Sequence, residues 1–338
     1  MATIQEVANR AGVSKATVSR VLSGNGYVGQ EKRQRVLDAI AETGYRPNLL
    51  ARNLATKSSQ TIGLVITNTL YSGSYFTELM AHSARILEQQ GRQLILADGK
   101  HTAEQEQAAI QFLLDLRCDG IIIYPRFLSI DALDAIISRH KQPILVINRR
   151  LRVNQSYCIY SDQHAGSVTA VSHLLNQGHR DIAFITGSLD SPTGVERLSG
   201  YRAALAAQGL DADPARIVSG RWTAQSGMEA VDTLLVRGVS FSALVASNDE
   251  MAIGAIKRLT ACRIAVPDQV SVIGFDDIPL APYITPSLSS MKLPVTEMIN
   301  ETIHRLLTML DGGDWSAHPP FTASLMLRDS VTQGPGAV

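Results

Sequence analysis

The chain has 338 residues, of which 45% are hydrophobic and 18% charged, a balance that suits a folded globular protein and excludes a disordered or mucin-like chain. At about 150 residues per domain, this length predicts about two domains with room for a small third. Lys and Arg number 31, as do Asp and Glu, so the net charge is zero. The charge is unevenly spread, because residues 1–60 hold nine basic and four acidic residues, a net charge of +5. A basic head on an acidic body predicts a polyanionic partner for the head.

The three cysteines, Cys118, Cys158 and Cys262, are too widely spaced for a disulfide framework or a CxxC metal site. The N-terminal sequence MATIQEVANRAG lacks the apolar run of a secretory signal, and no stretch approaches the ~18 apolar residues of a membrane span. We therefore expect a cytoplasmic protein with no membrane association.

Three short helices are predicted in a DNA-binding head of residues 1–46. In the first, over 4–11, apolar residues recur at i, i+3, i+4 and i+7, and Thr3 begins a capping box. Gly12 supplies a tight turn, and Ser14 caps the second helix. The third covers about 30–43. The expected inner face of the second helix is Val18, Val21 and Leu22.

Two short helices joined by a glycine-containing turn are typical of a helix-turn-helix, whose second helix enters the major groove of DNA with its N-terminal residues at base edges. The residues at that position are small, hydroxylated or basic: Ser14, Lys15, Ala16, Thr17, Ser19 and Arg20. Periodicity alone leaves a second interpretation equally open, an ordinary helical hairpin with a solvated basic face.

Residues 47–60 form a predicted connector with a short helix. Pro47 is suited to a first helical turn, and the stretch that follows is too short to be stable alone in water.

The remainder, 61–338, alternates strand-like and helical patterns and does so twice, which predicts two lobes of doubly wound parallel sheet. We place lobe 1 at about 61–161 with part of 287–330, and lobe 2 at about 162–286. In such sheets ligands bind in the crevice at the carboxyl ends of the strands. Apolar strand-like runs begin near Thr61, Gln93, Gly120, Pro143, Asp181, Arg216, Ala243 and Val270.

Several polar residues follow these runs. Carboxylates and amides can hydrogen bond to vicinal hydroxyls, an indole ring can stack on a sugar, and an arginine adds fixed donors. For Asp162 and Asp249 a helix N-cap is the favoured alternative, whereas for Arg197 and Asp276 ligand binding is favoured. Asp249 and Asp277 keep a structural assignment.

Neither a phosphate loop nor an HExxH or GxSxG motif is present, so no catalytic residue, metal site or cofactor is predicted. An α/β enzyme acting on sugars or nucleotides would need such a motif or an acid/base pair. A solute-binding protein of a transport system would have a signal peptide and would lack a basic helical head, and this sequence shows the opposite on both points. A ligand-regulated DNA-binding repressor is the leading hypothesis.

Whole strings of the chain resemble the LacI/GalR family of bacterial transcription regulators, from residue 4 to about 329. They include AGVSKATVSRVLSGN, GYRPNLLARNLATKSSQTIGLV, HLLNQGHRDIAFITG, FSALVASNDEMAIGAI and VPDQVSVIGFDDIP. The resemblance implies a hinge helix in the connector, with Leu54 as a wedge in the minor groove. With it, the candidate DNA-binding residues are Thr3, Ser14, Lys15, Ala16, Thr17, Ser19, Arg20, Asn48, Ala51 and Leu54.

The same resemblance implies effector contacts at Asp162, Arg197, Asn248 and Asp276. More variable pocket positions match Tyr75, Phe76, Asn148, Ser191, Thr193 and Trp222.

The implied protein is a homodimeric repressor of a carbohydrate-utilisation operon. It would bind pseudo-palindromic double-stranded operator DNA and respond to a small sugar effector, as inducer or corepressor. Other strings, such as NTLYSGSYFTEL and INRRLR, resemble a family member that controls β-glucoside use and favour such an effector. A sugar phosphate or purine remains an alternative, because Arg149 and Arg150 could lie near the crevice and favour an anionic group, or could be surface charge.

Overall fold

The computed structural model describes residues 2–24, 26–45, 58–68 and 73–336. It divides into two units, Met1–Gln60 and Thr61–Val338, each described by itself below. The predicted connector helix, with Asn48, Ala51 and Leu54, falls outside the described residues.

The head contains three helices, α1 Ile4–Ala11, α2 Lys15–Ser23 and α3 Gln30–Thr43. Thr3 and Glu6 form the predicted capping box, and Gly12 turns the chain with φ 62°. The buried side chains are small and apolar: Val7, Ala8, Ala11, Val18, Val21, Val36 and Ala39. The prediction that Leu22 faces inward was wrong, because 36% of its surface is exposed and Val18 and Val21 fill that side of α2.

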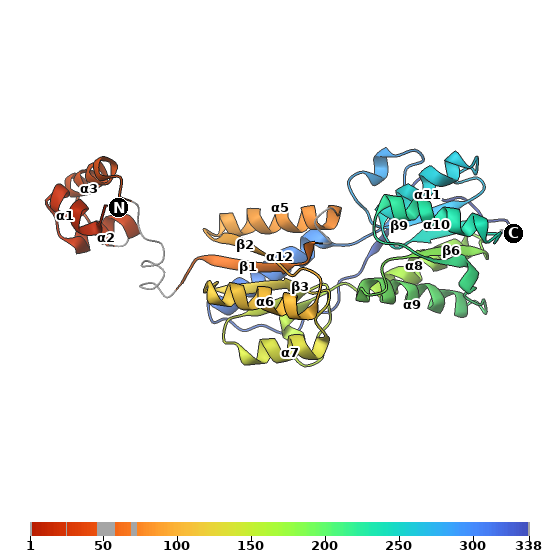
Figure 1. Cartoon of the computed structure of the whole chain (residues 1–338), viewed down its shortest axis with the longest axis horizontal. Coiled ribbons are helices and arrows are strands. Elements are labelled where there is room, and N and C mark those ends of the chain that lie inside the picture. The colour runs from red at the N-terminus through yellow and green to blue at the C-terminus, as the bar shows by residue number, and fades with distance from the viewer. Residues whose placement is uncertain (1, 25, 46–57, 69–72, 337–338) are drawn as a thin grey trace. The chain divides into compact units, whose positions relative to one another are not determined.

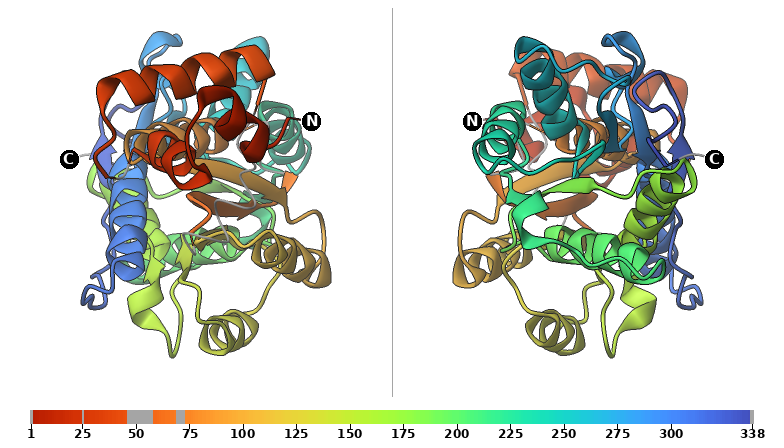
Figure 2. Two further views of the ribbon diagram at one scale, coloured as in Figure 1. Left: turned by 90° about the vertical axis from the view of Figure 1, so that its left-hand side faces the viewer. Right: turned by 90° about the vertical axis from the view of Figure 1, so that its right-hand side faces the viewer.

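The first sheet of the body has five parallel strands in the order β2-β1-β3-β4-β5. Their bounds are β1 Thr61–Ile66, β2 Gln93–Asp98, β3 Gly120–Tyr124, β4 Ile144–Ile147 and β5 Cys158–Ile159. Helices α6 (Ala103–Asp115) and α7 (Ile130–Arg139) pack on one face. Helices α5 (Ser74–Gln89) and α12 (Val295–Leu310) cover the other face. Figure 1 shows α5 lying along the sheet, and the left view of Figure 2 shows the blue α12 along one side of the body. Alternate strand residues therefore serve two separate apolar cores.

The second sheet has six strands in the order β11-β10-β9-β8-β6-β7, and only β11 runs antiparallel to its neighbour. The strands are β6 Ile182–Thr186, β7 Ile217–Ser219, β8 Ala243–Ala246, β9 Ser271–Asp276, β10 Ser289–Lys292 and β11 Ser324–Met326. Helices α8 (Gln163–Asn176) and α9 (Pro192–Ala206) pack on one face. Helices α10 (Ala224–Val236) and α11 (Asp249–Ala261) pack on the other.

The chain passes between the two sheets three times (Figure 1). It first leaves the first sheet between β5 and α8. It returns from β10 to α12, which packs on the first sheet, and then crosses again to β11. Within 287–330, therefore, the strands belong to the second sheet and α12 belongs to the first. No helix in the described part of the chain is long and apolar enough to cross a membrane.

Candidate functional site

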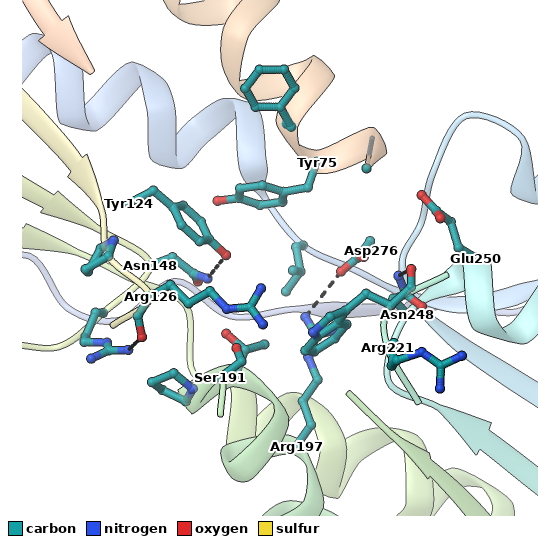
Figure 3. A pocket seen from close by; sticks show the side chains of 18 of the residues that line it. Tyr75, Tyr124, Arg126, Asn148, Ser191, Arg197, Arg221, Asn248, Glu250 and Asp276 are labelled. Atoms are coloured by element: carbon teal, nitrogen blue, oxygen red, sulfur yellow. Dashed lines mark hydrogen bonds and ion pairs between the residues drawn. The ribbon is translucent and has the colours of Figure 1, made fainter. Parts of the chain in front are cut away.

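A pocket of about 1000 Å³, including its open mouth, lies where the strands of both sheets end. Nine of the ten predicted effector residues line it: Tyr75, Phe76, Asn148, Ser191, Thr193, Arg197, Trp222, Asn248 and Asp276. Figure 3 shows those that it labels, among them Tyr75, Asn148 and Asp276, converging from elements of both lobes. The carboxyl ends of parallel strands meet at one edge, which explains why positions so far apart in sequence come together.

The tenth predicted residue, Asp162, lies outside this pocket. Its carboxylate accepts a hydrogen bond from the Ala165 amide at 2.8 Å and caps α8, and it lines a neighbouring hollow instead. Asn248 is both a helix cap and a pocket residue, because its side chain accepts a hydrogen bond from the Met251 amide at the start of α11 and also lines the pocket. The proposed cap at Asp249 was wrong, since Asn248 takes that place.

A chain of hydrogen-bonded side chains crosses from the first sheet to the second along the pocket. The Asn148 amide donates to the Tyr124 hydroxyl at 2.7 Å and accepts from Gln163 Nε2 at 3.1 Å. Gln163 in turn accepts from Arg197 Nε at 2.9 Å, and Arg197 Nη2 lies 3.3 Å from Asp276 Oδ1. The Tyr124–Asp276 chain, as we call these five residues, therefore links the ends of β3 and β4 to β9.

Arg197 is the centre of that chain and is only 2% exposed. Its guanidinium also donates to the Ser247 carbonyl and lies over the Phe275 ring, 4.2 Å from the ring centroid. A buried arginine is stable only when its donors are satisfied, and each of these partners belongs to the second lobe. Arg197 is thus both a wall of the pocket and part of the lobe's internal structure.

Asp276 is presented to the pocket by an unusual turn. Asp276 and Asp277 both have positive φ values, 102° and 54°. The turn is held from beneath by Asp249, whose carboxylate accepts from the Ile278 amide at 2.8 Å and from the Ser290 hydroxyl at 2.5 Å. Arg328 holds Asp277 from the side at 2.6 Å. Burial raises the pKa of Asp276, an effect that the Arg197 charge opposes.

Burial also raises the pKa of Asp249 well above its ordinary value, and the Asp276 charge adds to this. A raised folded-state pKa gives a stabilising contribution that is full below the unfolded pKa of about 4 and is lost as pH rises through the folded value. We expect Asp249→Asn to remove this loss, because an amide can accept from Ile278 and donate to Ser290. Urea unfolding of both proteins at pH 5 and pH 8 should show the variant gaining stability relative to the parent at pH 8. Asp249→Ala, the control, should destabilise at both pH values, and an unchanged difference between pH 5 and pH 8 would contradict this account.

The apolar part of the pocket is formed by aromatic rings. Trp222 has φ 65° and its carbonyl accepts from the Asn248 amide at 2.9 Å, which fixes the position of the indole. Tyr75 packs edge-on against Tyr124, with ring centroids 5.3 Å apart. Within the described residues the buried Tyr75 hydroxyl has no hydrogen-bond partner, and burial raises its pKa well above the ordinary value. It is therefore a neutral donor available to a ligand.

Gly187, which sequence reasoning missed, leaves space for the Trp222 ring. A Cβ at this position would lie 2.0 Å from Trp222 Cζ2. We expect Gly187→Ala to push the indole from its place and to weaken sugar binding by about tenfold or more, since a stacked ring contributes through exact contact. Sugar titrations followed by Trp222 fluorescence, in a Trp315→Phe background that removes the only other tryptophan, would measure this. Gly29→Ala, at an open position with an ordinary φ of -54°, is the control, and equal affinities would exclude a role for Trp222 packing.

Other pocket residues that sequence reasoning missed are Tyr124, Arg126, Arg221 and Glu250. Tyr124 is the last residue of the strand GIIIY and Arg126 follows that strand, so the strand-end rule that found Asp276 also applied to them. Arg149, left open between crevice and surface, lines the pocket, whereas the exposed Arg150 lines only neighbouring hollows.

The head presents the predicted reading residues to solvent. Lys15, Ala16, Ser19 and Arg20 are exposed on α2, and Ser14 accepts from the Thr17 amide at 3.2 Å as its cap. Thr3 is likewise exposed and caps α1. The N-terminal end of α2 is therefore free to approach base edges, as a recognition helix requires.

Exchange of the residues at positions 15 and 16 is expected to change which operator half-site is bound. Lys15→Gln with Ala16→Thr alters donors and shape at the tip of α2, where each good base contact contributes ~1–3 kcal/mol of discrimination. Selection from random duplexes would give the preferred sequence of each protein. Glu31→Gln, on the exposed start of α3, is the control, and an unchanged preference in the double variant would show that this end of α2 does not read bases.

Comparison with known proteins agrees with both units. Residues 3–48 match "Bacterial regulatory proteins, lacI family", and residues 171–331 match "Periplasmic binding protein-like domain". The chain is 62% identical over 331 residues to the HTH-type transcriptional regulator AscG of Escherichia coli K12, covering 98% of each. A lac repressor dimer bound to operator and an anti-inducer superposes with a TM-score of 0.88 at 28% identity, covering 98% of this chain and 99% of that one. A CelR–cellobiose complex superposes with a TM-score of 0.71 at 29% identity, covering 98% of this chain and 100% of that one.

A helix-turn-helix head on a two-sheet body with a pocket at its strand ends defines a ligand-responsive, DNA-binding transcription regulator. The chain belongs to the LacI family of bacterial regulatory proteins.

Proposed function

We propose that this regulator represses a carbohydrate-utilisation operon and that a small β-glucoside-like effector changes its affinity for the operator. The observation that carries the proposal is the composition of the pocket. The face of Trp222, the Asp276 carboxylate and the Asn248 amide lie together there, the combination that a pyranose with vicinal hydroxyls needs. Relatives named as a repressor bound to operator and as a cellobiose complex support both halves of the proposal.

The effector-binding residues would be the nine that line the pocket, with Asp162 acting indirectly as the cap of α8. The pocket would bind without catalysing a reaction, as the regulators related to this chain suggest, and of its two carboxylates Asp276 is already paired with Arg197. The protein would act in the cytoplasm, where operator DNA lies.

The coupling we propose uses a homodimer, in which two heads occupy the two half-sites of a pseudo-palindrome. A sugar in the pocket contacts residues of both sheets and so sets the angle between the lobes. That angle would set the spacing of the two heads through the connector at 47–60, where Leu54 would enter the minor groove. Operator and sugar are then linked reciprocally, each changing the affinity for the other by the same factor.

A direct test follows the release of operator by sugars. A palindromic duplex selected from a random pool is labelled with fluorescein, and its anisotropy with the full-length protein is measured at fixed salt. Cellobiose, salicin, arbutin and galactose are then titrated, with a scrambled duplex as control. We expect a β-glucoside to change operator affinity at least tenfold and galactose to have a smaller effect. Specific operator binding that no sugar alters would contradict the proposed effector class.

A further inference from the structure

The charged residues that line the pocket differ between its two ends. The second-lobe end holds both signs, the carboxylates Asp276 and Glu250 together with Arg197 and Arg221, and it also holds Trp222 and Asn248. The first-lobe end is basic, with Arg126 after β3 and Arg149 after β4. A neutral sugar needs only the chemistry of the second-lobe end, so the basic end requires a separate explanation.

Arg126 is held rigidly in place. Its backbone amide donates to Glu106 Oε1 at 2.7 Å, and the next two amides donate to Glu106 Oε2, so a fully buried carboxylate fixes the whole loop. The guanidinium lies over the Phe127 ring, 5.4 Å from its centroid. Figure 3 shows the side chain extending from the end of β3 toward the middle of the pocket. A preorganised guanidinium of this kind suits bidentate binding of an anion.

Arg126 already holds an anionic group, the carboxylate of Asp190. Its Nη2 lies 3.0 and 3.2 Å from the two carboxylate oxygens. The Asp190 side chain is 56% exposed, whereas that of Arg126 is 11% exposed. Such a half-exposed pair contributes little to stability, so a stronger anion can replace the carboxylate at small cost.

Arg149 supplies a second cation at the same end of the pocket. Its guanidinium donates to the Leu128 carbonyl at 3.0 Å and lies 3.5 Å from the Arg126 carbonyl, which ties it to the same loop. Burial lowers the pKa of Arg149, with the Glu106 charge acting in the opposite direction. An anion placed beside it would offset that desolvation.

The start of α9 forms the third side of this end. Ser191 is its N-cap residue, yet the Ser191 side chain makes no cap hydrogen bond, and Thr193 lines the pocket in the first turn. The N-terminus of this 15-residue helix carries partial positive charge, which is directed at the same space.

We propose that Arg126, Arg149 and the start of α9 bind a phosphate monoester, so that the preferred effector is a phosphorylated glycoside and the neutral sugar is a weaker ligand of the same pocket. This inference rests on the proposed function of the pocket as a sugar site. The sugar ring would lie against Trp222 and Asp276, and its phosphate would replace Asp190 on Arg126. Because Arg126 and Asp190 come from different lobes, that exchange would also alter a contact between the lobes.

Calorimetry on the full-length protein with matched ligand pairs tests the proposal. The pairs are cellobiose against cellobiose 6′-phosphate and salicin against salicin 6-phosphate, with glucuronides as carboxylate counterparts. We expect each phosphorylated ligand to bind at least tenfold more tightly than its neutral partner, with an affinity that falls as salt rises. The affinities of the glucuronides should lie between those of the neutral and the phosphorylated ligands, since a carboxylate carries less charge and fewer acceptor oxygens than a phosphate.

Four variants and one matched control locate the effect. In Arg126→Gln and Arg149→Gln the ratio of phosphorylated to neutral affinity should fall about tenfold or more, and Arg126→Lys should restore part of it. Asp190→Asn removes the competing carboxylate and should raise that ratio. Arg150→Gln is the matched control, adjacent in sequence but exposed and outside the pocket, and should leave the ratio within twofold. Thermal melting of each variant separates lost folding from lost binding.

The outcomes distinguish this inference from the proposed function. Neutral β-glucosides that bind as tightly as their phosphates, with a ratio that Arg126→Gln leaves unchanged, would overturn the anion site while leaving the sugar-responsive repressor intact. Failure of every glycoside, neutral or charged, to bind the pocket would overturn both.

Discussion

Replacement of Arg197 by alanine is expected to abolish the response to sugar and to lower the free energy of unfolding at the same time. The variant leaves the Asp276 carboxylate and the Ser247 carbonyl without their buried donor. Breaking a buried ion pair in this way costs ~3–5 kcal/mol. Loss of two or more hydrogen bonds to the ligand, at ~1.5–3 kcal/mol each, would weaken sugar binding more than a hundredfold. Urea unfolding, sugar calorimetry and operator anisotropy on one preparation would measure all three properties.

Contact with the ligand and support of the second lobe are therefore compatible roles for Arg197. Arg197→Lys keeps the charge but cannot reproduce the planar fork, so it should lose sugar affinity with a smaller loss of stability. Operator binding without sugar should survive wherever the body remains folded, because the head is a separate unit with its own core. Arg216→Ala, a half-exposed arginine of the same lobe outside the pocket, is the control. Sugar affinity within twofold of the parent in Arg197→Ala would exclude a role in binding.

Removal of residues 1–60 is expected to abolish operator binding while sugar binding by residues 61–338 stays within twofold of the parent. The body keeps both sheets and all four of its apolar cores, whereas the exposed residues of α2 and the net charge of +5 are lost. Electrophoretic mobility shift and calorimetry on the truncated and full-length proteins would show the separation.

As a control for the truncation, the operator affinity of the intact protein is measured at several salt concentrations. The logarithm of operator affinity should fall by ~0.9 per phosphate neutralised for each tenfold rise in salt. A truncated body that still shifted the operator would place DNA recognition outside the head and contradict the assignment.

The sequence predicted the regular parts of the fold well because they depend on local patterns. Eight strand-like runs became strands, and the caps at Thr3 and Ser14 form as expected. Strands β5, β10 and β11 were missed because they depart from the strand–helix alternation. No α-helix separates β5 or β10 from the strand before it, and β11 runs antiparallel at the edge of its sheet. Leu22 was misplaced because a helix in so small a domain buries a narrow face.

The sequence predicted those pocket residues that lie at the ends of predicted strands. Nine candidates line it because parallel strands end at one edge, a property of topology. Gln163 and Gly187 could not be found in this way. The hydrogen bond of Gln163 joins it to a residue 34 positions away, and the importance of Gly187 depends on where Trp222 folds back. Such contacts exist only in three dimensions.

The three crossings between the sheets have a consequence for how the chain matures during synthesis. The head has its full set of helices once residue 43 has left the ribosome. By contrast, the first sheet lacks α12 until residue 310, and the second lacks its edge strand until residue 326. Since domains fold as they emerge, N-terminal part first, the DNA-reading unit precedes the sugar-sensing unit by nearly the whole length of the nascent chain. A message that ends early would therefore yield a folded head with no complete sheet to control it.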